Sequence, residues 1–167
     1  MPKMATKAAD SVFYKARMEA AKWNDRLSSR EGAAEVTGLD RTRIAYIELG
    51  TTNPYPEEIL ILADCYNAPE LCNHYCSRMC PIGCQTVEPV EIRELESATL
   101  QLLSSIRGLP KITDNLIDIV EDGKIDEDER EDMESILHQL KQAANKIKAL
   151  ELVYEKRLRT QGEGEDG

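Results

Sequence analysis

The most telling stretch of the chain is residues 29–48, which read SREGAAEVTGLDRTRIAYIE. Ser29 and Asp40 are residue types that cap helix N-termini, because their side chains accept hydrogen bonds from unpaired backbone amides. Gly38 lies between them and suits a left-handed turn that would strain any residue with a Cβ. The stretch therefore predicts two short helices joined by a tight turn, and the second helix begins with arginines.

Both predicted helices have an inner side and an outer side. Ala33, Ala34 and Thr37 are small and recur at helical spacing, so a neighbouring helix can approach the first one closely. Ile44 and Ile47 lie three residues apart on the second helix and are expected to be buried. The residues expected on the outside are Arg41, Thr42, Arg43 and Tyr46. This is the layout of a helix-turn-helix, whose second helix enters the major groove of DNA.

These residues resemble the Cro/lambda-repressor-like helix-turn-helix family, also known as the XRE family. The resemblance covers roughly residues 10–79. The positions typical of the family are Ala34, Gly38, Ile44, Ile47, Glu48, Gly50, Asn53 and Pro54. The chain departs from the family at Ala33 and Thr37, where a larger apolar residue is usual.

The resemblance implies a sequence-specific transcriptional regulator that binds double-stranded DNA, a repressor of bacterial or mobile-element genes. It places Arg41, Thr42 and Tyr46 at base-reading positions, and it places Arg30 and Arg43 at positions that contact the DNA backbone. The alternatives are an ordinary helical hairpin within a core and a protein-interaction module of the antitoxin type. An enzyme is not expected, because the two histidines lie in different segments without a nucleophile–base pattern and no phosphate loop is present.

The fold class predicted from the whole pattern is all-α, with a five-helix lambda-repressor-like head over residues 10–80. The first helix is expected from Ser11 to Leu27, with Phe13, Ala16, Ala20 and Trp23 on its apolar side. Pro56 is expected to begin a fourth helix, and a break at residues 67–69 separates it from a fifth. The residues expected to face inward from these last two helices are Ile59, Leu62, Ala63, Tyr66, Leu71 and Tyr75.

A linker is predicted at residues 81–90, followed by a long antiparallel helical hairpin at residues 91–159 and a disordered tail at residues 160–167. The first hairpin segment places Ile92, Leu95, Thr99, Leu102, Ile106, Leu109, Leu116, Ile117 and Val120 on its apolar side. Gly108 and Pro110 are expected to kink or break this segment. The apolar residues of the second segment are Met133, Ile136, Leu140, Ala143, Ile147, Leu150 and Tyr154. Their three–four spacing is typical of coiled coils and favours a homodimer, with folding back onto the head as the alternative.

Four cysteines recur every four residues, at Cys72, Cys76, Cys80 and Cys84. Thiolates in this arrangement are suited to zinc or an iron–sulfur cluster, which act as structural or redox-sensing groups. However, the three-residue spacing is not that of a zinc knuckle. Reduced thiols that pack the fifth helix are therefore the competing interpretation, and a disulfide is disfavoured in a reducing cytosol.

Residues 118–129 align with a calcium-binding EF-hand loop, with acids at the first, fifth, ninth and twelfth positions. Val120 occupies the third position, where the loop needs an oxygen ligand, so calcium binding is the weaker interpretation. The stronger one is a helix that ends near Gly123 and a new helix capped by Asp126, with Glu129 as the reciprocal partner.

The formal net charge is −10, which is unusual for a protein expected to bind a polyanion. Residues 1–60 carry nine basic and nine acidic residues, whereas residues 61–167 carry twelve and twenty-two. Non-specific affinity depends on the phosphates that are neutralised locally, so one head is expected to bind DNA modestly and two heads tightly. No apolar run approaches bilayer length and no signal segment is recognised, so a cytoplasmic protein without membrane association is expected.

Overall fold

The computed structural model describes residues 7–121 and 123–162 of the chain, and all the regular structure in this part is helical. The elements in chain order are η1 (Lys7–Asp10), α1 (Val12–Ala20), η2 (Asp25–Ser28), α2 (Arg30–Thr37), α3 (Arg41–Glu48), α4 (Pro56–Cys65), α5 (Glu70–Arg78), α6 (Gly83–Thr86), α7 (Leu95–Val120) and α8 (Glu127–Gly162). The all-α prediction is confirmed. Among the described residues, no helix has both the length and the apolar content needed to cross a bilayer.

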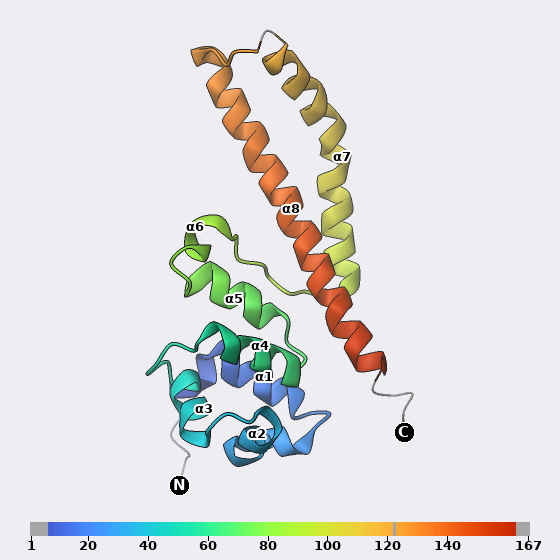
Figure 1. Ribbon diagram of the computed structural model, residues 1–167. Helices are drawn as coiled ribbons and strands as arrows, with labels where there is room; N and C mark the ends of the chain where they lie inside the picture. Colours follow the sequence, from blue (N-terminus) through green and yellow to red (C-terminus); the bar gives the residue numbers. More distant parts are fainter. Residues whose placement is uncertain (1–6, 122, 163–167) are drawn as a thin grey trace. The chain divides into compact units, whose positions relative to one another are not determined.

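The chain divides into two compact units. Among the described residues, one unit contains residues 7–89 together with residues 158–162, and the other contains residues 90–157. We refer to residues 7–89 as the head and to residues 90–157 as the hairpin. The head is a cluster of short helices, whereas the hairpin consists of long ones (Figure 1).

A single apolar core holds the head together. Its buried members come from all of the helices α1 to α5 and from the segments that join them. They are Phe13, Ala20, Leu27, Ala33, Ile44, Ile47, Ile59, Leu62, Ala63, Tyr66, Ala68 and Leu71. The inward residues predicted for α4 are therefore confirmed, and Tyr75 of α5 packs partly buried against this core.

The first helix is shorter than predicted. It ends at Ala20, and the chain then turns into the 3-10 helix η2, for which the Asn24 side chain accepts a hydrogen bond from the Arg26 amide at 3.3 Å. An asparagine offers the backbone a local partner and so competes with helix continuation. As a result Trp23 is 45% exposed, and its predicted place on the apolar side of a long helix is wrong.

Helix α4 begins at the predicted residue, and the predicted break follows it. Pro56 is the first residue of α4, where its missing amide costs nothing. The break predicted at residues 67–69 is present, and Asn67 there has a positive φ of 47°. The predicted linker also contains α6, a single helical turn.

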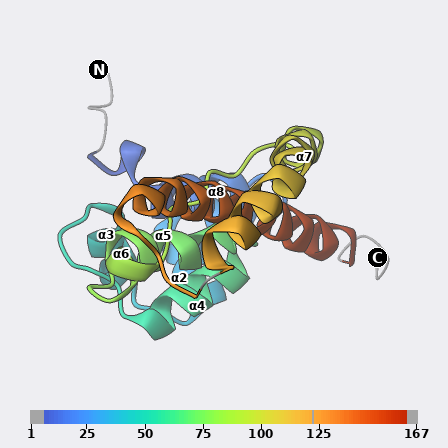
Figure 2. The same cartoon turned by 90° about the horizontal axis from the view of Figure 1, so that it is seen from above.

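The hairpin consists of α7 and α8, which run in opposite directions (Figure 1). Of the two outcomes expected near Pro110, a kink or a break, the structure shows the kink. Helix α7 continues through this residue and has 26 residues in total. Its axis changes direction in the middle of the helix (Figures 1 and 2), as expected where a proline removes one backbone hydrogen bond.

The buried side of α7 differs from the predicted one. Ile112 and Ile119 form a core cluster with Ile136 of α8, and Leu109, Leu116, Met133 and Leu140 pack around it. By contrast Ile106, Ile117 and Val120 are exposed, as are Ile147 and Tyr154 on α8. Ile92 precedes the helix altogether. The predicted stripe thus mixed residues from two neighbouring sides of each helix.

The turn between the two helices supports the capping interpretation. Helix α7 ends at Val120, Gly123 has a positive φ of 75°, and α8 begins at Glu127. The Asp126 amide donates a hydrogen bond to Glu129 Oε2 at 3.0 Å, which is half of the reciprocal cap that was predicted. Helix α8 continues to Gly162, so residues 160–162 are helical and not disordered, and residues 163–167 lie outside the described part of the chain.

Candidate nucleic-acid interface

Helices α2 and α3 and the turn between them have the geometry predicted from the sequence. Ser29 Oγ accepts a hydrogen bond from the Gly32 amide at 3.0 Å, and Asp40 Oδ1 accepts from the Thr42 and Arg43 amides at 2.7 and 3.2 Å. Gly38 adopts a left-handed conformation, with φ 73° and ψ 3°. These caps fix where each helix begins and allow the chain to reverse sharply between them.

Thr37 shows how the chain accommodates a polar residue at a buried position of α2. This side chain is buried, and its hydroxyl donates to the Ala33 carbonyl at 2.7 Å and accepts from the Leu39 amide at 3.2 Å. A buried hydroxyl that is hydrogen-bonded on both sides avoids the cost of desolvation. Thr37 therefore supports the turn as well as filling space in the core.

Helix α3 is sharply divided into an inner and an outer side. Ile44 and Ile47 are each 2% exposed, so their predicted burial is confirmed. Arg41, Thr42 and Tyr46 are exposed, as expected for the outer side. The side chains predicted to read bases thus lie together on the outward side of a helix whose opposite side is anchored in the core.

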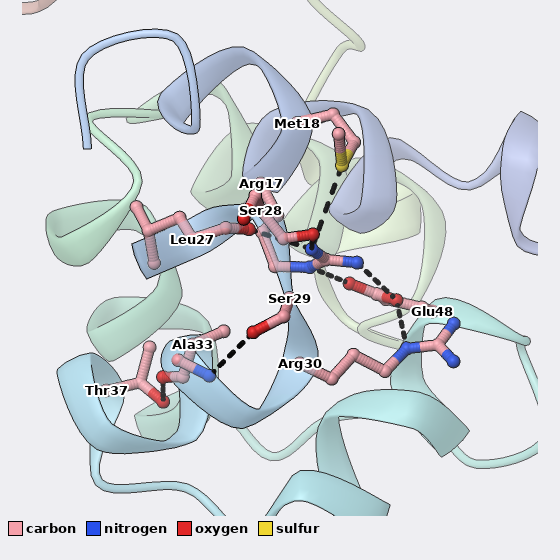
Figure 3. A network of polar contacts seen from close by, with 10 residues as sticks. Arg17, Met18, Leu27, Ser28, Ser29, Arg30, Ala33, Thr37 and Glu48 are labelled. Atoms are coloured by element: carbon pink, nitrogen blue, oxygen red, sulfur yellow. Dashed lines mark hydrogen bonds and ion pairs between the residues drawn. The ribbon is translucent and has the colours of Figure 1, made fainter. Parts of the chain in front are cut away.

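A buried ion pair lies behind this surface. Arg17 of α1 and Glu48 of α3 are 3% and 2% exposed, and Arg17 Nε donates to Glu48 Oε1 at 2.6 Å (Figure 3). Arg17 Nη1 also donates to the carbonyls of Leu27 and Ser28, at 2.8 and 3.2 Å. These bonds satisfy a charge that would be very costly to bury alone, and they join three segments of the head.

Arg30 belongs to the same network. Its Nε donates to Glu48 Oε2 at 2.7 Å, and its side chain is 25% exposed (Figure 3). The prediction that Arg30 contacts phosphate is not tested by this contact. Through this contact the Arg30 guanidinium has a structural role, because it holds the start of α2 against the end of α3.

Sequence reasoning did not find Arg17. A signal was present, because Arg17 follows Phe13 by four residues and precedes Ala20 by three, which places it on the apolar side of its helix. Glu48 similarly follows the buried Ile44 by four residues. Arg17 and Glu48 thus lie on the apolar sides of two helices. A basic and an acidic residue in such positions are expected to pair with each other in the core.

Arg43 is more firmly held than Arg41. Its Nε and Nη2 donate to the two oxygens of Glu58, both at 2.7 Å, and Nη2 also donates to the Asn53 carbonyl at 3.0 Å. The guanidinium lies over the ring of Tyr55, 4.9 Å from its centroid. This bidentate, stacked arrangement ties α3 to the loop before α4. The predicted contact of Arg43 with the DNA backbone stays a prediction.

Arg41 pairs with Glu31 of α2 in a more exposed setting, because both side chains are more than half exposed. Hydrogen bonds from the Glu31 backbone amide and from the Arg41 side chain lower the pKa of the Glu31 carboxyl. The amides of Thr42 and Arg43 likewise lower the pKa of Asp40, and the hydrogen bonds from Arg43 lower that of Glu58. The outer side of α3 therefore carries arginines whose charge is balanced by ionised carboxylates.

The cysteines do not form a recognisable metal site. Among the described residues, no three His, Cys, Asp or Glu side chains gather closely enough to hold a metal ion. All five cysteines are free thiols, and Cys65 and Cys72 pack against the head core. The Gly83 amide donates to Cys80 Sγ at 3.4 Å, and Gly83 lies so close to the Cys76 carbonyl that a Cβ there would clash. Zinc or iron–sulfur binding at Cys72, Cys76, Cys80 and Cys84 stays a prediction.

His74 lies near the cysteines but faces the core of the head. Its ring contacts Phe13 edge to face, with 6.0 Å between centroids. Burial and the nearby Arg78 charge lower the pKa of His74, which favours the neutral ring. The residue is thus half-buried at the margin of the core.

Comparison with known proteins gives no match to this chain among protein-family models, curated proteins or solved structures.

Proposed function

We propose that this protein is a sequence-specific DNA-binding transcriptional regulator of the Cro/lambda-repressor-like type, with α3 as its recognition helix. The observation that carries the proposal is the division of α3 into a buried isoleucine side and an exposed side bearing Arg41, Thr42 and Tyr46. Recognition helices of this motif contact base edges with residues near their N-termini. Arg41 and Thr42 are the first two residues of α3.

The contacts of the arginines support different roles for them. An exposed ion pair contributes only about 0–1 kcal/mol, so DNA can draw Arg41 away from Glu31 at little cost. Arg43 is held by two hydrogen bonds to a largely buried carboxylate. We therefore assign base reading to Arg41, with Thr42 and Tyr46 beside it, and we assign Arg30 and Arg43 to the DNA backbone.

Selection of bound fragments from random duplex DNA tests this proposal. The full chain is expected to enrich one sequence motif, because α3 presents donors and acceptors in a fixed register. Recovery of fragments with no common motif would contradict it. The selection needs no knowledge of the regulated genes.

The selected duplex then allows the role of Arg41 to be measured. Arg41→Ala is expected to cost about 1–3 kcal/mol against the selected base at one position and to relax specificity there. Arg26→Ala is the matched control, because Arg26 is another exposed arginine paired with a glutamate but belongs to η2. An equal loss on all sequences would make Arg41 a phosphate contact.

One observation favours a second candidate function. The arginines of η2, α2 and α3, at positions 26, 30, 41 and 43, each pair with a glutamate, which reduces the positive potential expected of a DNA-binding surface. The head would then be a protein-interaction module of the antitoxin type. A stoichiometric complex with a protein partner, together with no enriched motif, would favour this alternative.

A further inference from the structure

Two of the four regularly spaced cysteines lie in a single helical turn. Cys80 precedes α6, and Cys84 is the second residue of that helix. The Cys84 amide donates a hydrogen bond to the Cys80 carbonyl at 2.8 Å, with the four-residue spacing of an α-helix. Both residues are free thiols, and Cys80 is half-buried whereas Cys84 is exposed. One turn thus carries two thiols, and solvent reaches one of them readily.

The side chains of both residues are directed over this turn. The Gly83 amide donates to Cys80 Sγ at 3.4 Å, so this sulfur lies over the start of α6. The Cα–Cβ bonds of a helix tilt toward its N-terminus, so the Cys84 side chain leans back toward Cys80. Residues four apart on a helix have their Cβ atoms about 5–6 Å from each other. The backbone of one turn therefore makes the two thiols neighbours.

The other cysteines are placed differently. Cys65 and Cys72 pack against the core of the head. Cys76 lies four residues before Cys80, but the Cys80 amide donates to the Tyr75 carbonyl at 2.9 Å, five residues back. The helical register is therefore not kept between Cys76 and Cys80. Cys80 and Cys84 are thus the pair that one helical turn places side by side outside the head core.

The spacing of this pair fits a bridging metal ion better than a disulfide bond. A disulfide needs Cβ atoms about 3.5–4.5 Å apart and sulfurs about 2 Å apart, which a helical turn provides only if it unwinds. Two thiolates on one metal ion, with metal–sulfur bonds of about 2.3 Å, keep their sulfurs roughly 4 Å apart. The turn can therefore hold a metal between its two sulfurs without being unwound.

We propose that Cys80 and Cys84 bind one Cu(I) ion between their sulfurs. Structural zinc is held by four protein ligands, and within residues 7–121 and 123–162 no three metal-binding side chains gather into a site. Soft thiolates select Cu(I), which two of them satisfy. Each thiol releases one proton to solvent on binding, and the copper stays monovalent, so no electron is transferred. The Gly83 amide then donates to a metal-bound thiolate and orients it.

The bound ion has a consequence for the linker. Helix α6 is a single turn within residues 81–90, and helices this short are marginal on their own. Its backbone is closed by the Cys84 amide on the Cys80 carbonyl, at 2.8 Å, and by the Val87 amide on the Gly83 carbonyl, at 2.7 Å. Because the ion joins residues 80 and 84 across the same turn, it stabilises both bonds. The linker is therefore more ordered with Cu(I) than without it.

Anaerobic titration of the reduced full chain with Cu(I), in competition with the coloured chelator bicinchoninate, tests the site. We expect one ion per chain. Loss of an outer-shell partner alone costs a metal site about 10–100-fold in affinity, so Cys80→Ser and Cys84→Ser should each cost about a hundredfold or more. A serine at position 80 can still accept from the Gly83 amide, as Ser29 does from Gly32. Cys80→Ser therefore removes the metal ligand and keeps the local cap.

Cys72→Ala and Cys76→Ala are the matched controls, because they remove thiols of α5 that the proposed site does not use. They should change the affinity by less than about twofold, and far-UV circular dichroism checks that every variant keeps its helix content. Equal losses in the controls, or wild-type binding no tighter than that of the double variant Cys80→Ser, Cys84→Ser, would overturn the proposed site.

Hydrogen exchange tests whether the ion acts on α6. The amides of Cys84 and Val87 should exchange more slowly with Cu(I) than without it, because opening the turn must then break a metal–sulfur bond. Unchanged exchange at both amides would overturn the bridge across α6. DNA takes no part in either measurement, so the outcomes are independent of whether the head binds DNA.

Discussion

The head and the hairpin differ in how they cover their apolar side chains. The head buries twelve residues in one core, and it satisfies the Glu48 carboxylate inside that core with two arginines. The hairpin core cluster has three buried isoleucines, and a row of large apolar residues remains exposed beside it. The two cores thus differ in kind: the head core also holds a paired charge, whereas exposed apolar side chains that are available for association lie beside the hairpin core.

The largest expected effect concerns the buried ion pair of the head. Glu48→Ala should lower the free energy of unfolding by about 3–5 kcal/mol, because it leaves the Arg17 charge buried without its partner. Glu35→Ala removes an exposed pair with Arg26 and should cost less than about 1 kcal/mol. Urea unfolding monitored by the fluorescence of Trp23 measures both. Similar losses for the two variants would contradict the structural role of Glu48.

A second prediction contrasts leucines of the two regions. Leu62→Ala in the head should cost about 2–5 kcal/mol, since this side chain is 1% exposed and its removal leaves a cavity. Leu137→Ala in the hairpin, at 48% exposure, should change the stability of the monomer by about 0.5 kcal/mol or less. Urea unfolding of dilute samples gives both values. A large loss for Leu137→Ala at high dilution would mean that this side chain is covered within one chain.

Glycine substitutions should have opposite signs in the two regions. Gly38→Ala is expected to lower the free energy of unfolding by about 1–2 kcal/mol, because a left-handed φ of 73° strains a residue with a Cβ. Gly108→Ala lies within α7, where an added Cβ meets no atom within 4 Å, and it should stabilise the protein by about 0.5–1 kcal/mol. Thermal unfolding shows whether the melting temperature moves down for the first and up for the second.

The pH dependence of the head provides a smaller effect. The hydrogen bonds from Arg43 hold the pKa of Glu58 below its ordinary value of 4.5, so the folded state favours the ionised form. This contribution is complete above pH 4.5 and is lost as the pH falls through the lower folded-state pKa.

Between pH 6 and pH 3, the Glu58→Gln variant should therefore lose less stability than the wild type, in thermal unfolding at matched ionic strength. Glu57→Gln removes a neighbouring exposed carboxylate and leaves the Arg43–Glu58 pair in place, so it should keep the wild-type profile. Parallel pH profiles for wild type and Glu58→Gln would contradict the ionised pair.

Much of the head follows from local signals in the sequence. Ser29, Gly38 and Asp40 act through their own backbone neighbours, so caps and the turn could be located from residue type alone. The buried isoleucines of α3 followed from helical spacing. The pairing of Glu31 with Arg41 and of Glu58 with Arg43 was not predicted, because it depends on the tertiary placement of α2 and α4 beside α3.

The hairpin was harder to predict in detail. Its two helices and their turn were recognised, but apolar residues occur on two neighbouring sides of each helix, so spacing alone could not tell Ile119 from Val120. The early end of α1 depended on competition between Asn24 and the continuing helix, which residue spacing does not measure.

The affinity of Glu31→Gln for the selected duplex tests most directly whether the outer side of α3 binds DNA with arginines that carboxylates hold in the free protein. We predict binding about two- to fivefold tighter than the wild type, because the substitution frees Arg41 and removes a negative charge beside the phosphates. Glu19→Gln, which removes the same charge from an exposed pair on α1, should leave the affinity close to that of the wild type. Unchanged or weaker binding by Glu31→Gln, or an equal gain for Glu19→Gln, would contradict the account.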